Sequence, residues 1–179
     1  MTQASQIYGK SLYDLAAEEN LTEEITEEMD AVGKIFKENP DYITLLSEPS
    51  IHKDERLRML DDAFRGEVHP YLLNFLKILT EKGIMREFGA CARRVRELYN
   101  KDHGISSAVV TSAVPLSEEQ AGQLQQRLEV MSGRKVILSQ RIDETVLGGL
   151  RVEIDGRLLD GTVRTRLDDL RRKVDSTVI

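Results

Sequence analysis

The sequence predicts a mainly α-helical protein, with an N-terminal bundle of six helices followed by a smaller α/β domain of the order βαββα. Apolar residues recur every three or four positions through the first half of the chain, which is the period of an amphipathic helix. At Gly104 the pattern changes to the alternation typical of strands. The 179 residues, 40% hydrophobic and 31% charged, suffice for two small folded domains. We therefore place these domains at 1–104 and 105–179.

Three helices are expected before Pro49. The second of them begins at Thr22, a suitable N-cap, and stops near Asn39 because Pro40 cannot continue a helix. A shorter third helix lies around 42–46. The apolar stripe of the first helix consists of Tyr8, Leu12, Leu15 and Ala16.

Three further helices complete the predicted bundle. The fourth covers 54–64, and Pro70 occupies the first position of the fifth, where proline is favoured. The fifth helix is apolar over a wide arc, so we expect it to be central and buried. The sixth ends at Gly104, which suits a left-handed helix cap. Its apolar stripe consists of Phe88, Cys91, Ala92, Val95, Leu98 and Tyr99.

The second domain is expected to open with a strand at 106–114. Ser117 and Gln120 form the pattern of a capping box at the start of a helix that Gly133 ends. Two strands follow that helix, the second of them at 150–154, where apolar and charged residues alternate.

The end of the chain carries two further signals. Asp155-Gly156 is a hairpin turn signal. An amphipathic helix is then expected to close the domain, with arginines on its polar faces. Its apolar stripe consists of Val163, Leu167, Leu170 and Val174.

Composition excludes several classes of function. A net charge of −6 argues against a nucleic-acid binder, because phosphate contacts need a basic surface. The single cysteine, Cys91, allows no intrachain disulfide and fits a reducing compartment. We find neither a signal-peptide pattern nor an apolar run near the roughly 18 residues that a membrane span needs.

The sequence favours structural roles for the residue types that most often form catalytic, metal or phosphate sites. Cys91 lies on an apolar helical stripe, so a buried thiol is expected. The three histidines lack the spacing of metal ligands, and His69, before Pro70, is expected to start a helix. Gly148-Gly149 precedes a strand rather than a helix, so a bulge or close backbone approach is favoured over a phosphate loop.

Two acidic segments also favour structural roles. Asp160-Gly161-Thr162 is interpreted as a turn and cap before the last helix. Positions 14–30 contain many carboxylates and no Lys or Arg. A solvated helix surface is the favoured interpretation, with a docking surface for a basic partner as the alternative.

Two C-terminal segments resemble a known family. Val-Leu-Gly-Gly-Leu-Arg-Val-Glu-Ile at 146–154 and Leu-Asp-Gly-Thr-Val-Arg-Thr-Arg-Leu at 159–167 are similar to the signature of F-type ATP synthase delta subunits. The family includes the mitochondrial oligomycin-sensitivity-conferring protein. Further resemblances occur in the family's order at 8–16, 46–51, 74–79 and 112–117. The departures are Thr162 for the usual serine, and Gly9 and Ser11 for alanines of the first helix.

The resemblance implies a non-catalytic stator subunit, with no cofactor and no nucleic acid, that links the catalytic head to the peripheral stalk and resists rotary torque. It implies that the second domain grips the b subunits of the stalk, and that attachment to the cytoplasmic face of the bacterial cell membrane is indirect. A groove between the first and fifth helices would bind the N-terminal helix of an alpha subunit. Its implied contacts are Tyr8, Ser11, Leu12, Leu15, Phe75, Ile78, Leu79 and Lys82.

Some of these contacts have a competing interpretation. Leu12, Leu15 and Leu79 fit a role in the core equally well, whereas Ile78 lies off the main apolar stripe of its helix. Two other functions stay open from the residues alone. One is a small nucleotide-using enzyme built around Gly148-Gly149, and the other is a soluble helical adaptor or RNA-binding module using the arginine-rich last helix.

Overall fold

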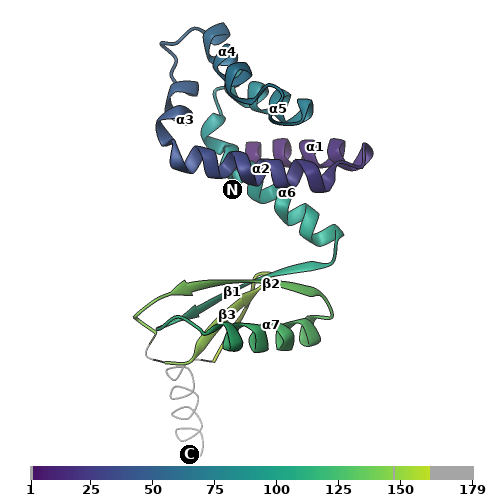
Figure 1. Cartoon of the computed structure of the whole chain (residues 1–179), viewed down its shortest axis with the longest axis vertical. Helices are drawn as coiled ribbons and strands as arrows, with labels where there is room; N and C mark the ends of the chain where they lie inside the picture. Colours follow the sequence, from purple (N-terminus) through teal and green to yellow (C-terminus); the bar gives the residue numbers. More distant parts are fainter. Residues whose placement is uncertain (1, 147, 162–179) are drawn as a thin grey trace, which may run out of the picture. The chain divides into compact units, whose positions relative to one another are not determined.

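The computed structural model (Figure 1) describes residues 2–146 and 148–161, and the chain divides into two compact units, Met1–Tyr99 and Asn100–Ile179. The protein is mainly helical with a small four-stranded sheet, which confirms the predicted fold class at that level. The seam between the units falls inside a helix. The boundary predicted at Gly104 lies just beyond the end of that helix and stays a prediction.

The helices of the first unit follow the predicted order closely. Proline begins both the third and the fifth helix, where its missing N–H costs nothing. The elements are α1 (Gln3–Glu18), α2 (Thr22–Glu38), α3 (Pro40–Leu46), α4 (Lys53–Phe64), α5 (Pro70–Glu81), the 3-10 turn η1 (Met85–Glu87) and α6 (Phe88–Asp102).

One continuous core joins these helices. As predicted, α5 is its most buried element, with Leu72, Leu76 and Leu79 fully shielded from solvent. Aromatic rings connect the helices around it: the ring of Phe36 meets the ring of Phe88 edge-on, with centroids 4.9 Å apart. Burial of such large apolar side chains is the main source of stability in a unit of this size.

The predicted cap of α2 is wrong. Leu21 occupies the N-cap position, and Thr22 is already the first helical residue, with no side-chain cap bond. The Leu21 carbonyl accepts the first helical bond, from the Ile25 amide at 2.9 Å, while the leucine side chain packs on the core. The helix therefore begins one residue earlier than predicted, with a partly buried leucine at its N-cap.

The described residues of the second unit form a four-stranded sheet with helix α7 against it (Figure 1). Its described elements are β1 (Ile105–Ser112), α7 (Glu118–Ser132), β2 (Lys135–Ile142), β3 (Leu150–Ile154) and β4 (Arg157–Asp160). The spatial order is β2-β1-β3-β4. The β1–β2 pair is parallel, so α7 serves as its crossover, and β3 is antiparallel to β1.

Local signals position the ends of these elements as predicted. The capping box is present, since the Ser117 hydroxyl accepts from the Gln120 amide and the Gln120 side chain accepts from the Ser117 amide. Gly133 closes α7 in the left-handed region with φ of 66°. Asp155 and Gly156 both have positive φ, as a two-residue hairpin turn between β3 and β4 requires.

The order βαββα is incomplete in one respect. The described residues follow βαβββ, because Arg157–Asp160 forms a fourth strand paired with β3. This strand is only four residues long and lacks alternation, so its sequence carries no strand signal, and pairing across the hairpin creates it. The helix predicted around Val163, Leu167, Leu170 and Val174 lies outside the described residues, as does Thr162.

Candidate partner-binding surface

The surface predicted to bind a partner lies on α1 and α5, which are in contact. One face of α1 points into the core and carries Gly9, Leu12 and Ala16. A different line of side chains, four residues apart, stays outside: Ile7, Ser11 and Leu15. Ile7 is 56% exposed and Leu15 is 37% exposed. α1 therefore has a second, partly apolar stripe without a covering element among the described residues.

The α5 side of the surface is more closely tied to the core. Leu72, Phe75 and Leu79 are buried, whereas Ile78 is half-buried and Lys82, the C-cap residue, is exposed. Within the described part of the chain Lys82 has no ion-pair partner, so its ammonium group is available to an incoming chain.

The eight predicted contacts thus separate into two groups. Leu12, Phe75 and Leu79 are at most 5% exposed, so they support the surface from beneath. The other five reach the surface: Tyr8, Ser11, Leu15, Ile78 and Lys82. Sequence reasoning missed Ile7. Its spacing of four from Ser11, off the buried stripe, is the signal that could have found it.

Ion pairs brace the helices that flank this surface. Lys53 of α4 pairs with Glu81 of α5 at 2.9 Å. Further along the same pair of helices, Asp61 Oδ1 forms ion pairs with Lys77 Nζ at 2.6 Å and with Arg65 Nη2 at 3.0 Å. The hydrogen bond from Lys77, reinforced by Arg65, holds the pKa of the Asp61 carboxyl below its ordinary value. These contacts fix α5 against α4.

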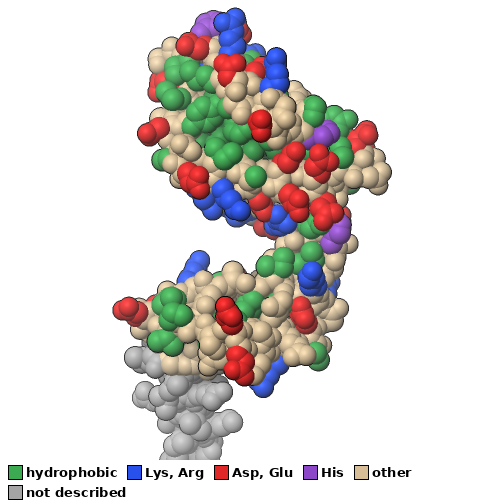
Figure 2. Space-filling view, in the orientation of Figure 1, with side chains coloured by type: hydrophobic (Ala, Val, Ile, Leu, Met, Phe, Trp, Pro, Cys, Tyr) green, Lys and Arg blue, Asp and Glu red, His purple; other side chains and the backbone are tan. Residues whose placement is uncertain are grey.

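Most carboxylates of 14–30 lie exposed, and acidic side chains are spread over the face of the first unit seen in Figure 2. Two of them have structural roles. Both oxygens of Glu28 accept the backbone N–H of His69, at 3.0 and 2.8 Å, and Asp30 pairs with Arg96. Glu28 thereby satisfies a backbone donor at the start of α5.

The cysteine and two of the histidines, which were considered for catalysis or metal binding, have structural roles. Cys91 is fully buried, and burial, with a smaller effect of Glu87, raises the pKa of its thiol to about 11. The Nδ1 atoms of His52 and His69 each accept a backbone N–H at the start of a helix. No cluster of potential metal ligands occurs within residues 2–146 and 148–161.

The glycine pair also lacks the geometry of a phosphate loop. Gly148 and Gly149 have φ of 140° and 86°, and strand β3 begins directly after them. A phosphate loop instead leads into a helix N-terminus, whose free N–H groups hold the anion. Across the described ranges, no helix is long and apolar enough to span a membrane.

Comparisons with known proteins agree over nearly the whole chain. A family model described as ATP synthase delta (OSCP) subunit matches residues 4–174. The chain is 32% identical over 168 residues to ATP synthase subunit delta of Lactobacillus gasseri, covering 93% of this chain and 92% of that protein. It is 31% identical over 172 residues to the protein of the same name from Clostridioides difficile, covering 96% and 95%.

A solved structure shares the fold. One chain of the cryo-EM structure of the Toxoplasma gondii mitochondrial ATP synthase hexamer matches with a TM-score of 0.76, covering 97% of this chain and 98% of that chain. The sequence identity is 22%, so this likeness is one of fold.

Proposed function

The chain belongs to the ATP synthase delta (OSCP) subunit family, and on that premise we propose that it clamps the catalytic head of an F-type ATP synthase to its peripheral stalk. Members of this family are structural, non-catalytic subunits of the synthase. The protein therefore serves ATP synthesis and ion transport as part of that complex, and its association with the membrane is indirect.

The first unit is proposed to bind the amphipathic N-terminal helix of an alpha subunit on α1 and α5. The uncovered stripe of Ile7, Ser11 and Leu15 supports this site, together with Ile78 of α5. An amphipathic helix would lay its apolar face along these side chains, and Lys82 would meet an acidic residue at its edge. Six helices around one core would act as a single bundle and give this surface a rigid base.

The second unit is proposed to hold the C-terminal ends of the stalk's b subunits. Its β3–β4 hairpin supports this assignment, because consecutive leucines, Leu158 and Leu159, are 58% and 42% exposed on opposite faces of β4. Apolar side chains exposed in this way suit a partner that covers the edge of the sheet. The complex would place the protein at the cytoplasmic face of the bacterial membrane.

Binding of a synthetic alpha N-terminal peptide, measured by calorimetry, tests the first site. Leu15→Asp and Ile78→Asp should each weaken binding at least tenfold, because each buries a charge against an apolar helix face. Ile35→Asp is the matched control, since Ile35 is 43% exposed and lies on α2 rather than on α1 or α5. Equal affinity for all three variants and the parent would remove the site on α1 and α5.

A separate experiment tests the second site. Leu158→Asp should reduce capture of the chain by a fragment containing the C-terminal end of b, and it should leave binding of the alpha peptide intact. Val130→Asp, on the exposed face of α7, serves as the control. If Leu158→Asp has no effect on capture, the hairpin is not the stalk-binding surface.

A further inference from the structure

The last turn of α6 is tied to the sheet of the second unit. α6 runs without a break from Phe88 to Asp102, yet the contacts of Asn100 place it in the second unit. The Asn100 side chain is 7% exposed, and its Nδ2 donates to the hydroxyl of Ser107 on β1 at 3.0 Å. This bond therefore closes across the turn at Gly104.

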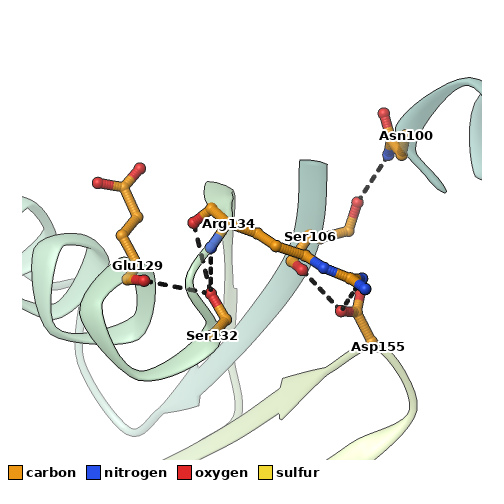
Figure 3. A network of polar contacts seen from close by, with 7 residues as sticks. Asn100, Ser106, Glu129, Ser132, Arg134 and Asp155 are labelled. Carbon is orange, nitrogen blue, oxygen red and sulfur yellow. Dashed lines mark hydrogen bonds and ion pairs between the residues drawn. The ribbon is translucent and has the colours of Figure 1, made fainter. Parts of the chain in front are cut away.

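A second set of contacts holds the start of β1 from the other side (Figure 3). The Ser106 hydroxyl donates to the Asp155 Oδ2 at 2.6 Å, and Arg134 lies 3.8 Å from the same oxygen. The Asp155 amide also donates to the Ser107 carbonyl at 3.4 Å. The strand that receives the Asn100 bond is thus itself fixed to the β3–β4 turn.

The backbone hydrogen bond across the turn at Gly104 is weak. Gly104 has φ of 63°, and its N–H reaches the Lys101 carbonyl at 3.4 Å, which is long for a hydrogen bond. The Oδ1 of Asn100 is buried with no partner among the described residues. An apolar residue would avoid that cost, so packing alone does not explain an amide here.

We propose that the Asn100 side chain is a latch that keeps the Gly104 turn closed, so that the last turn of α6 moves as part of the sheet. The value of such a latch rests on the proposed stator function, in which the chain carries load along its length. Without it, we expect the last turn of α6 to open more often.

Residue-resolved hydrogen exchange of the full isolated chain tests the latch, with the amides of Lys101, Asp102 and Gly104 as reporters. Ser107→Ala removes the acceptor, and Asn100→Leu removes the donor while retaining volume. A net hydrogen bond of about 0.5–1.5 kcal/mol corresponds to a roughly two- to tenfold rise in exchange at these amides for each variant. The double variant should exchange no faster than either single one.

Ser139→Ala is the matched control, because the Ser139 hydroxyl lies on the neighbouring strand β2 and donates to the Ala108 carbonyl of β1 rather than to the turn. It should leave the three reporter amides unchanged. Unchanged exchange in Ser107→Ala, or effects that add in the double variant, would overturn the latch. If Asn100→Leu fails to fold, the exchange rates of Ser107→Ala alone decide whether the latch exists. No binding partner is present, so the result is independent of whether the alpha or b sites are correct.

Discussion

Gly9 on α1 lies so close to α6 that a β-carbon built on it would be 2.9 Å from the carbonyl oxygen of Cys91. The same β-carbon would also lie 2.9 Å from the Cβ of Arg94. Glycine lowers helix stability by about 1 kcal/mol relative to alanine, and here it permits a close approach of two helices. Gly9, one of the two residues of the first helix that depart from the family pattern, is therefore a packing residue.

Gly9→Ala should lower the free energy of unfolding by about 1–2 kcal/mol, since overpacking costs more than the gain in helix propensity. Gly33→Ala on α2 is the matched control, because its β-carbon would meet Phe88 at an ordinary 3.8 Å. That variant should be neutral or more stable. Urea unfolding measures both, and a Gly9→Ala protein at least as stable as the parent would refute the close approach.

Glu28→Ala should destabilise the first unit by about 1–2 kcal/mol, because it leaves the His69 amide at the start of α5 without its acceptor. Glu28→Gln, which keeps an oxygen, should recover part of the loss. Thermal unfolding provides the measurement, and Glu27→Ala, an exposed neighbour, provides the reference. Equal losses for Glu27→Ala and Glu28→Ala would show that the contact contributes nothing.

Asp61 should make the free energy of unfolding depend on pH in the acidic range. Its folded pKa lies below the ordinary 3.8, so the carboxylate stabilises the fold above that pH and ceases to do so as the pH falls through the folded pKa. Asp61→Asn should be less stable than the parent at pH 7, and the difference should begin to shrink below about pH 4 and vanish below the folded pKa. A constant difference between parent and Asp61→Asn across this range would contradict the ion pair.

Cys91 should resist thiol reagents in the folded chain. It is fully buried and its pKa is about 11, so little thiolate exists at pH 8 and none is accessible. Labelling with a maleimide should be slow in buffer and fast in denaturant, with a folded-state rate that tracks unfolding. Rapid labelling under native conditions would place the thiol at the surface and α6 in a different orientation.

Local signals in the sequence account for much of the fold. Pro70, Gly133 and the Asp155-Gly156 pair mark ends and turns because their backbone preferences act within a few residues, and the structure confirms each one. The wide apolar arc of α5 predicted its central position, because a helix that is surrounded by the core carries apolar residues on most of its faces.

What the sequence could not predict depends on distant contacts. The Glu28 bond to His69 joins residues 41 positions apart, and β4 exists through pairing with β3. Leu15 lies three residues from Leu12 of the core stripe of α1, yet it is 37% exposed. Which apolar residues serve a partner rather than the core depends on packing between helices.

We expect this chain to join two parts of the synthase and to transform no substrate. Membranes that carry the synthase but are depleted of this chain test the claim, with ATP synthesis driven by an imposed ion gradient as the measurement. Adding back the chain should restore synthesis and retain the catalytic head on the membrane, whereas a variant carrying both Leu15→Asp and Ile78→Asp should do neither. Full ATP synthesis in the depleted membranes would contradict the claim.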